Sequence, residues 1–379
     1  MSAKTHYDVI VLGLGAMGGA ALYTLAKRGH SVCGVEQHHI AHDLGSSHGT
    51  LRMIRRAYFE HPAYMPLLNR AYDLWKELED EAGVSLLAEH GLMISGAPDS
   101  DTIRGLEACY AENPVPHERI SADEARHRFP ALHPPDDHIV YCDPSGGYLY
   151  AERTAERQIE LAERHGAQVH LHETVLDWKA DADTVTVTTD KRELSASRLV
   201  IALGPWAAQV LAEIGVKLQV VRKTQFWYRA PDEAPYVGPE FPCFAFDLGD
   251  RFFYGFPAVD DRGIKIAEHT GGDEVADPDS VSRALEPEDE KRVQEFLRIA
   301  IPDLQPELTH FSVCMYTNSP DEHFILDTHP RYDSVILGAG FSGHGFKFTP
   351  VIGEILADLA IDGRTAHEID FLRLSRFGV

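Results

Sequence analysis

Three glycines near the N-terminus have the spacing of a dinucleotide-binding turn. Gly13, Gly15 and Gly18 form the pattern G-x-G-x-x-G between an apolar run at residues 9–12 and the helical pattern "AALYTLAKRG". Glycine lets the backbone approach a pyrophosphate, and a helix N-terminus favours its negative charge. Glu36 follows a second strand pattern, where a carboxylate accepts hydrogen bonds from ribose hydroxyls. The motif predicts an FAD or NAD site without separating the two cofactors, and a turn that only packs a helix on a strand is the alternative.

A second glycine-rich loop lies near the C-terminus. The stretch "GAGFSGHGFKF", residues 338–348, follows an apolar strand pattern and precedes a helical one. Glycine at this density allows backbone N–H groups to approach a ligand closely. We therefore expect a second cofactor-contacting turn, with His344 and Lys347 beside it.

The five cysteines form neither a disulfide nor a metal motif. They are widely spaced and include no C-x-x-C pair, which argues against a disulfide framework and a thiolate zinc site, so no metal is expected. A buried structural thiol is the default expectation for each of them. Cys314 stands out because the surrounding stretch "SVCMYTNSPDEHF" is otherwise mainly polar and aromatic.

Two arginines in "RMIRR" have a spacing that brings side chains together on a helix. Arg52 and Arg55 stand three residues apart, so on a helical turn they would share a face. An isolated arginine cluster is usually solvated or ion-paired. The pair therefore indicates chemistry only in combination with a ligand site.

The composition is that of an acidic globular protein. The chain holds 35 basic and 59 acidic side chains, and its net charge of −24 at pH 7 disfavours nucleic acids and anionic membranes as partners. No apolar run approaches the ~18–20 residues that span a bilayer. The N-terminal stretch passes directly into a strand pattern without room for a signal peptide, so we expect a cytoplasmic protein.

The elements that must position these residues fall into two groups of segments. Residues 1–84, 151–215 and 320–379 contain buried-strand and glycine patterns typical of one discontinuous dinucleotide-binding domain. Residues 85–150 and 216–319 are rich in strand patterns and predict a substrate or catalytic domain with a mixed or antiparallel sheet. The expected fold class is therefore α/β, with a Rossmann-like domain interleaved with a mixed-sheet α+β domain.

Six motifs, taken in order, resemble one family of flavoenzymes. They are "GLGAMGGA" with Glu36, "GSSHGTLRMIRRAYFE", "YGFP", "IKIAEHTGG", "CMYTNSPDEHFILD" and "GFSGHGFKF". Together they resemble the FAD-dependent amine oxidases of the monomeric sarcosine oxidase and N-methyltryptophan oxidase family, in the D-amino-acid oxidase superfamily. The resemblance runs nearly end to end. It implies a glutathione-reductase-type FAD domain and a smaller catalytic domain whose sheet covers the flavin.

The resemblance implies an oxidase of N-methyl amino acids. The leading expectation is a monomeric sarcosine oxidase, which converts sarcosine, O₂ and water to glycine, formaldehyde and hydrogen peroxide. N-methyl-L-tryptophan or another secondary or cyclic amino acid is the alternative substrate, because the motifs divide between the two family types. An NAD-dependent dehydrogenase would leave Cys314 unexplained, and a non-catalytic flavin sensor would leave Arg55, Lys265 and Lys347 unexplained.

The same resemblance implies which residues hold FAD. In the family, the cysteine of the C-M-Y-T motif carries the flavin through a thioether to its 8α-methyl carbon, and Cys314 occupies that position. Neighbouring arginine and lysine charges would favour the attacking thiolate. The expected cofactor contacts are Gly13, Gly15, Ala16, Met17, Gly18, Glu36, Gly45, Ser46, Arg52, Val175, Gly204, Trp206, Cys314, Met315, Gly343, Gly345, Phe346 and Lys347.

The resemblance assigns the substrate carboxylate to two cations. Arg55 and Lys347 are expected to bind it through charge-assisted hydrogen bonds, which would hold the substrate amine over the flavin. Glu60 matches a family acid that pairs with the carboxylate-binding arginine when the site is empty.

Four further residues match catalytic positions of the family. Arg52 is expected to lie against the flavin, and Tyr254 and His269 are expected to contact the substrate. Without the resemblance, Tyr254 and His269 would be read as a core aromatic residue and a satisfied histidine. Lys265 matches the lysine that activates oxygen, because a cation beside the flavin stabilises superoxide-like charge as it forms.

Two departures from the family pattern bear on the site. Family members commonly have G-D-T-R where this chain has Gly49-Thr50-Leu51-Arg52, so we expect some loop contacts to the cofactor to differ. Ala245 falls where sarcosine oxidases tend to carry a bulkier methionine. This substitution predicts a roomier substrate pocket.

Overall fold

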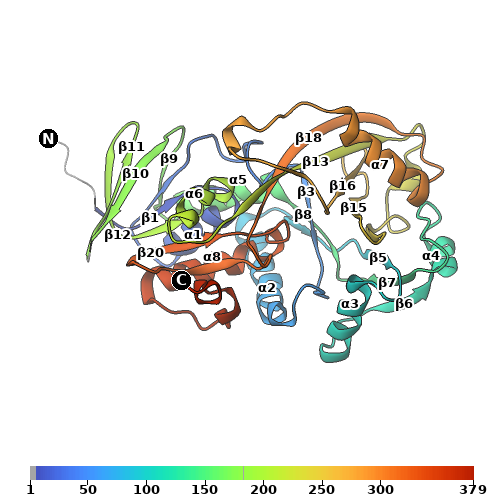
Figure 1. Ribbon diagram of the computed structural model, residues 1–379, viewed down its shortest axis with the longest axis horizontal. Helices are drawn as coiled ribbons and strands as arrows, with labels where there is room; N and C mark the ends of the chain where they lie inside the picture. Colours follow the sequence, from blue (N-terminus) through green and yellow to red (C-terminus); the bar gives the residue numbers. More distant parts are fainter. Residues whose placement is uncertain (1–5, 182) are drawn as a thin grey trace.

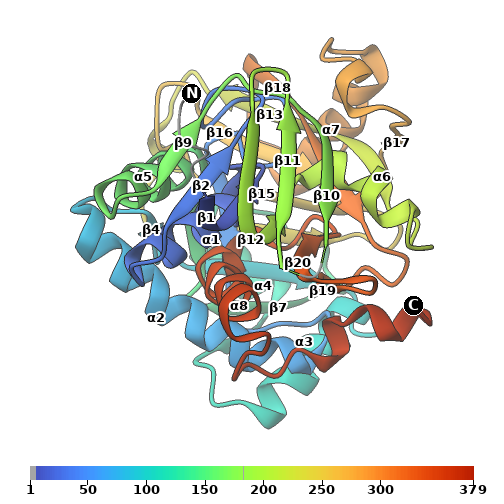
Figure 2. The ribbon, with the colours of Figure 1, turned by 90° about the vertical axis from the view of Figure 1, so that its left-hand side faces the viewer.

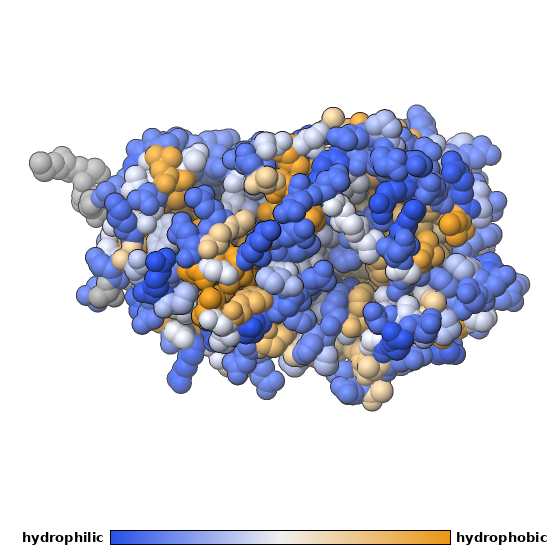
Figure 3. All heavy atoms as spheres, in the orientation of Figure 1, coloured by the Kyte–Doolittle hydropathy of each residue, from blue (hydrophilic) through white to orange (hydrophobic). Residues whose placement is uncertain are grey.

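The computed structural model describes residues 6–181 and 183–379 of the chain. Within this part, two large sheets lie toward opposite ends of an elongated molecule, and a small sheet lies near its middle (Figure 1). Polar residues cover most of the face shown in Figure 3, where apolar side chains form small separate patches. In the described residues, no helix has the length and apolar character needed to cross a membrane.

The first large sheet has eight strands and carries the N-terminal glycine motif. The strands are β1 (His6–Leu12), β2 (Val32–Val35), β9 (Gln168–His170), β10 (Val175–Ala180), β11 (Val185–Thr189), β12 (Glu193–Ile201), β19 (Ile325–His329) and β20 (Tyr332–Ala339). Their order is β10-β11-β12-β1-β2-β9, with β20 paired to β12 and β19 paired to β20. β1 pairs in parallel with β2 and β12, as expected of a strand that is apolar on both faces.

Helix α1 (Ala16–Lys27) follows the first glycine turn and is buried along most of its length. It packs against β1, β2, α5 (Ala151–Arg164) and α8 (Thr349–Asp362) (Figure 2). A Cβ atom on Gly353 of α8 would lie 2.6 Å from the Ala20 carbonyl carbon of α1. Glycine at this position therefore permits the close approach of the two helices.

The second large sheet has nine strands and is mixed. The strands are β5 (Leu92–Gly96), β6 (Glu118–Ser121), β7 (Ile139–Asp143), β13 (Gln219–Arg229), β14 (Cys243–Asp247), β15 (Phe252–Phe256), β16 (Ile264–Glu268), β17 (Asp273–Glu274) and β18 (Glu307–Asn318). Their order is β17-β13-β16-β15-β14-β5-β7-β6, with β18 paired to β13. β14 and β5 are parallel, whereas β13 is antiparallel to β16, β17 and β18.

Side chains alternate between the two faces of this sheet, as the pleat of a strand requires. Phe253 packs against Phe296 of α7 (Pro287–Ala300), with ring centroids 4.4 Å apart, in an apolar cluster that also contains Phe244. Their sequence neighbours Tyr254 and Ala245 line a cavity instead. The alternation thus separates the apolar core under α7 from the candidate site.

The small sheet corrects one local expectation. It pairs β3 (Leu51–Ile54) and β4 (Leu87–Ala88) with β8 (Gly147–Tyr150), all antiparallel. The helical turn considered for "RMIRR" is therefore wrong, because residues 51–54 form a strand. Arg52 and Arg55 do not share a helical face: Arg52 contacts Cys314 and Arg55 contacts Glu60.

The remaining helices complete the layers around the sheets. They are α2 (Met65–Ala82), α3 (Asp101–Glu112), α4 (Ala122–Arg128) and α6 (Ala207–Ala212). α2 ends at Gly83, whose φ of 68° is left-handed, as is common at helix C-termini. Trp75 of α2 donates Nε1–H to the Lys347 carbonyl at 2.9 Å. This contact ties α2 to the second glycine loop.

Candidate active site

A cleft of about 460 Å³ opens where β1 and β2 end. The expected cofactor residues that line it are Gly13, Gly15, Ala16, Met17, Glu36, Gly45, Ser46, Arg52, Val175, Gly204, Trp206, Met315, Gly343, Gly345 and Phe346. Gly18 is not among the lining residues. A Cβ atom there would lie 1.8 Å from the Gly13 carbonyl oxygen, so this glycine permits close packing of α1 on the turn.

Glu36 is held in place at the end of β2. Its Oε2 accepts the backbone N–H of Leu14 at 2.8 Å, and its Oε1 accepts that of His38 at 3.0 Å. The carboxylate also lies 3.8 Å from His42 Nε2. Two N–H donors leave acceptor capacity on both oxygens, which suits the hydroxyl pair of a ribose.

Part of the cleft lining consists of residues that sequence reasoning missed. Leu176 and Trp178 come from β10, and Gln209 and Val210 come from α6. Leu176 is 65% exposed although it is apolar. These residues belong to no motif, and only the packing of β10 and α6 around the cleft brings them together.

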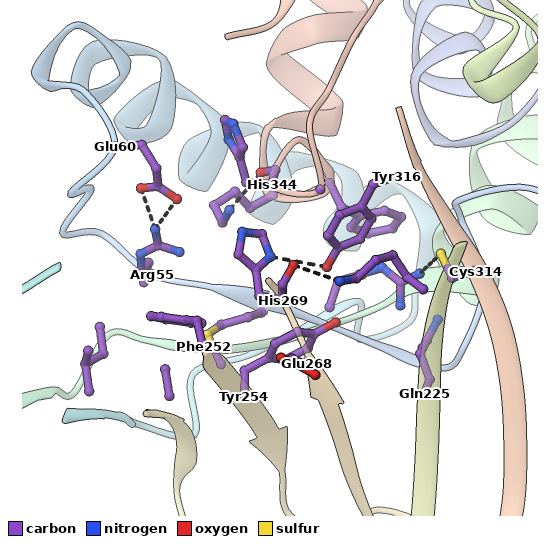
Figure 4. Close-up of a pocket in the computed structure, with 18 of the residues that line it drawn as sticks. Arg55, Glu60, Gln225, Phe252, Tyr254, Glu268, His269, Cys314, Tyr316 and His344 are labelled. Atoms are coloured by element: carbon purple, nitrogen blue, oxygen red, sulfur yellow. Dashed lines mark hydrogen bonds and ion pairs between the residues drawn. The ribbon is translucent and has the colours of Figure 1, made fainter. Parts of the chain in front are cut away.

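A smaller cavity of about 80 Å³ adjoins the cleft, and the two share Arg52, Tyr316, Gly343 and Phe346 as lining residues. The expected residues that line the smaller cavity are Arg52, Arg55, Glu60, Ala245, Tyr254, His269, Cys314 and Lys347. Residues from β3, β15, β16, β18 and the second glycine loop thus meet around one space (Figure 4).

One end of this cavity holds an ion pair. Arg55 Nη2 donates to both carboxylate oxygens of Glu60, at 2.6 and 2.5 Å, and its guanidinium lies 4.2 Å from the Phe59 ring centroid (Figure 4). Burial alone would raise the pKa of Glu60, but the charges of Arg55, His344 and Lys347 outweigh it and hold the pKa at about 2. Glu60 is therefore the resident anion of a cationic site.

Lys347 is the second cation at this end. Its Nζ donates to the His344 carbonyl at 2.7 Å, and burial together with the charge of Arg55 lowers its pKa to about 7. The His344 ring is fixed by Tyr58 Oη and by the Glu322 carbonyl. Burial lowers the pKa of His344 to about 4, so its ring is neutral at pH 7.

The opposite wall is aromatic and includes a residue that sequence reasoning missed. His269 Nδ1 lies 3.3 Å from Tyr316 Oη, and Tyr254 lines the same space (Figure 4). Burial, with the charge of Lys223, lowers the pKa of His269 to about 3. Tyr316 had a signal in the sequence, because it stands two residues after Cys314 and so shares its face of β18.

Cys314 differs from the other cysteines in its surroundings. All five are free and buried, but Cys33, Cys109, Cys142 and Cys243 line neither cavity, whereas Cys314 lines the smaller one. Arg52 Nη2 lies 3.6 Å from its sulfur atom (Figure 4). The thiol is thus the one cysteine sulfur placed against both a cation and a cavity.

Lys265 lies behind the lining of the cavity and not in it. Its Nζ donates to the carbonyls of Gly49 and Leu51, at 2.5 and 2.8 Å, while burial and the charge of Arg52 lower its pKa. Glu152 holds the same loop from its amide side, accepting from Gly49 N at 2.6 Å and from Thr50 N at 2.9 and 3.0 Å. The loop that departs from the family pattern is therefore clamped between a lysine and a carboxylate.

The unpaired polar groups in and near the two adjoining cavities fit a bound FAD. Thr317 Oγ1 in the cleft and Gln225 Oε1 in the smaller cavity are buried without a hydrogen-bond partner, as is His48 Nε2 nearby. Such groups are costly unless a ligand or water satisfies them. The residues that line both cavities, Arg52, Tyr316, Gly343 and Phe346, would hold a dinucleotide that extends from the cleft into the smaller cavity.

Solved structures resemble this fold along its whole length. NikD, described as an unusual amino acid oxidase essential for nikkomycin biosynthesis, has a TM-score of 0.86 at 27% identity, with 97% of this chain and 98% of that chain covered. L-proline dehydrogenase from P. horikoshii has a TM-score of 0.85 at 22% identity. The expected α/β fold is confirmed.

Curated relatives also match nearly end to end. Monomeric sarcosine oxidase of Streptomyces avermitilis is 39% identical, with 96% of each chain covered. Human peroxisomal sarcosine oxidase is 36% identical over 99% of this chain and 97% of its own, and N-methyl-L-tryptophan oxidase of Escherichia coli is 36% identical over 98% and 99%. Residues 8–359 match the family described as FAD dependent oxidoreductase, which confirms FAD over NAD for the glycine motif. The chain belongs to this FAD-dependent oxidoreductase family.

Proposed function

We propose that the protein is an FAD-dependent oxidase of N-methyl amino acids that acts on sarcosine. The net reaction converts sarcosine, O₂ and water to glycine, formaldehyde and hydrogen peroxide. The observation that carries the proposal is the pair of buried cations Arg55 and Lys347 at one end of a cavity of about 80 Å³. Relatives named as sarcosine oxidases, at 36–39% identity, support it.

In this proposal the substrate carboxylate replaces Glu60 beside Arg55. The ion pair occupies Arg55 Nη2, with Glu60 oxygens at 2.5 and 2.6 Å. Removing a carboxylate from a buried arginine is unfavourable unless another anion takes its place. A substrate carboxylate supplies that anion, and Lys347 Nζ contributes a second charge-assisted hydrogen bond.

His269 and Tyr254 then face the amine end of the substrate. The lowered pKa of His269, about 3, keeps its ring neutral at pH 7, so it does not repel a cationic amine and one ring nitrogen accepts a hydrogen bond. When bound, FAD supplies the acceptor for the two electrons of the amine and the donor of electrons to O₂. The protein orients the amine, since Tyr254 and His269 both line the cavity.

Lys265 is proposed to assist the reaction with oxygen. Two of the three N–H bonds of its ammonium form meet the carbonyls of Gly49 and Leu51, which leaves one donor. A buried cation with a spare donor stabilises negative charge that develops on oxygen more strongly than it would in water.

Cys314 is proposed to attach FAD covalently through a thioether to the flavin 8α-methyl carbon. Its place in the lining of the smaller cavity and its contact with Arg52, which lines both cavities, support this assignment. Acid precipitation is the test: yellow colour should stay with the wild-type pellet and leave with the supernatant in Cys314→Ser. A Cys243→Ser control should keep its colour in the pellet, and a colourless wild-type pellet would exclude the linkage.

Anaerobic bleaching of the flavin tests the substrate. Rapid bleaching by sarcosine, with formaldehyde formed on admitting air, is the expected result. Ala245, which lines the cavity as a small residue, favours a second candidate with a bulkier substituent. Bleaching by N-methyl-L-tryptophan, proline or pipecolate in preference to sarcosine would replace the proposed substrate by that candidate.

The domain division and the state of the protein in the cell are further parts of the proposal. The FAD-binding segments 1–84, 151–215 and 320–379 are supported by the strands of the eight-stranded sheet, and the catalytic segments 85–150 and 216–319 by those of the nine-stranded sheet.

The relative named monomeric sarcosine oxidase supports a monomer, and sedimentation tests it. Five free cysteines support the cytoplasm as a reducing location.

A further inference from the structure

Lys223 is a buried cation whose hydrogen bonds all go to one turn. The residue is 5% exposed, and its Nζ donates to the carbonyls of His269, Thr270 and Gly271 at 2.9, 2.8 and 2.9 Å. An ammonium group has three N–H bonds and no acceptor. The three consecutive carbonyls therefore satisfy it fully, so Lys223 has no donor left for a ligand.

The backbone of this turn is shaped for the lysine. Gly271 and Gly272 have φ values of 65° and 112°, which residues other than glycine rarely adopt. A Cβ atom on Gly272 would lie 2.6 Å from the Arg222 carbonyl oxygen and 3.1 Å from Lys223 Cδ. Glycine at these positions lets three carbonyls point at one ammonium.

The turn carries His269 from the end of β16 into the cavity. Lys223 itself stands opposite Cys314 in the pairing of β13 with β18, and its Nζ lies 5.2 Å from the Tyr316 ring centroid. His269 in turn meets Tyr316 through Nδ1. In Figure 4, a dashed line joins His269 to Tyr316 and so links the turn after β16 to β18.

The preceding residue provides a natural comparison on the same strand. Arg222 is also buried, and it donates to the carbonyls of Ser282 and Ala284 at 3.0 and 2.8 Å and to Asp289 at 2.8 and 2.9 Å. It lines neither cavity. Arg222 and Lys223 thus anchor two different loops, because successive side chains of a strand point to opposite faces of the sheet. Only the loop held by Lys223 reaches the candidate active site.

We propose that Lys223 is a positioning residue for His269: its ammonium fixes the turn at residues 269–271, so that the His269 ring is held against Tyr316 and the substrate cavity. This inference rests on the proposed function in one respect, namely that His269 contacts the substrate. Without the cation, the three carbonyls lose their shared donor and the turn relaxes away from the cavity.

Hydrogen–deuterium exchange of the holoenzyme tests the positioning independently of any substrate. In Lys223→Met, exchange of the His269 amide, which donates to the Phe252 carbonyl at 2.7 Å, should be faster by about 10-fold, because the turn opens more often. In Lys223→Arg, which keeps a cation, most of the protection should return. Arg222→Met should lower the melting temperature and leave exchange of the His269 amide within about twofold of wild type. Unchanged exchange in Lys223→Met would overturn the proposal.

Ligand binding tests the consequence for the site. Methoxyacetate keeps the carboxylate of sarcosine and replaces its amine by an ether oxygen, so calorimetry measures its binding without turnover. Its affinity should fall about 10-fold in Lys223→Met and should stay within about twofold of wild type in Arg222→Met. Should Lys223→Met fail to fold, Lys223→Gln, with two amide donors, and Gly272→Ala, which crowds the same turn, give the same comparison.

The outcomes separate this inference from the proposed function. Faster exchange of the His269 amide in Lys223→Met, with no bleaching of wild type by any N-methyl amino acid, would retain the positioning and reject the substrate. Bleaching of wild type by sarcosine, with exchange and methoxyacetate affinity unchanged in Lys223→Met, would retain the function and reject the positioning.

Discussion

The two ends of the smaller cavity hold their positive charges in different ways. At the carboxylate end, formed by Arg55, Glu60 and Lys347, the arginine is paired with a carboxylate at 2.5 Å. At the sulfur end, Arg52 and Cys314 line the cavity and Lys265 lies behind them; here the cations donate mainly to backbone carbonyls of residues 46–51.

This difference has a physical consequence. A carboxylate partner neutralises a cation and can be exchanged for another anion. Carbonyl partners orient a cation without neutralising its charge. In the proposed function, the first end exchanges one anion for another and the second supplies positive charge for the reaction with oxygen.

Removing the charge of Lys265 should have the largest effect on the difference between the two ends. In Lys265→Met, reoxidation of the reduced flavin by O₂ should slow by about 100- to 1,000-fold, because the charge developing on oxygen loses its cation. Flavin reduction by sarcosine should stay within about threefold of wild type. Stopped-flow measurement of each half-reaction checks this, and equal losses in both would contradict the assignment.

Removing the arginine of the carboxylate end should produce the opposite pattern. Arg55→Met should weaken sarcosine binding by about 30-fold, since a charge-assisted hydrogen bond contributes roughly 2 kcal/mol. The reaction of reduced flavin with O₂ should not change. Binding is measured from the substrate dependence of anaerobic bleaching, with Arg222→Met as the control for loss of a buried arginine. A loss confined to the oxygen reaction would reverse the roles of the two ends.

The pKa of Lys347 predicts that ligand binding at the carboxylate end depends on pH. Because burial and Arg55 lower this pKa to about 7, the ammonium is present below pH 7 and is lost as the pH rises above it. The affinity for methoxyacetate should therefore fall between pH 7 and pH 9, by up to about 10-fold per pH unit for one proton. Calorimetry across this range should give a flatter profile for Lys347→Met; an unchanged profile would assign the effect to another group.

The smallest expected effect concerns the resident anion. Since Arg55 holds the pKa of Glu60 at about 2, below its usual value near 4.5, this carboxylate contributes stability above about pH 4.5 that is lost as the pH falls toward 2. Between pH 3 and pH 6, the melting temperature of Glu60→Gln should therefore change by about a few degrees less than that of the wild type. Calorimetric scans measure it, and an equal acid dependence in both proteins would contradict the ion-pair account.

Local spacing was sufficient to predict the first cofactor turn. Gly13, Gly15 and Glu36 belong to one strand-turn-helix-strand unit, so their separation along the chain determines their separation in space. The same holds for the helix after the second glycine loop, which is α8. Alternation in β18 would also have pointed to Tyr316 beside Cys314.

Long-range pairing explains what sequence reasoning missed or misread. The arginine spacing in "RMIRR" fits a helix, but pairing of Leu51–Ile54 with β8 makes a strand. Lys223 reaches the turn at residues 269–271 only because β13 lies beside both β16 and β18. The register between strands that are far apart in sequence leaves no mark on either strand alone, so no local pattern indicates these contacts.

The close contact of α1 with α8 also constrains the order in which the molecule is assembled. α1 is synthesised early, whereas Gly353, which packs against Ala20 of α1, belongs to α8 (Thr349–Asp362) and is synthesised late. During synthesis the apolar surface of α1 must wait for a partner from the end of the chain, and contacts of such long range slow folding. A ribosome-bound chain that ends before α8 should therefore bind chaperones that recognise exposed apolar helices, and release from them should coincide with the emergence of the last helix.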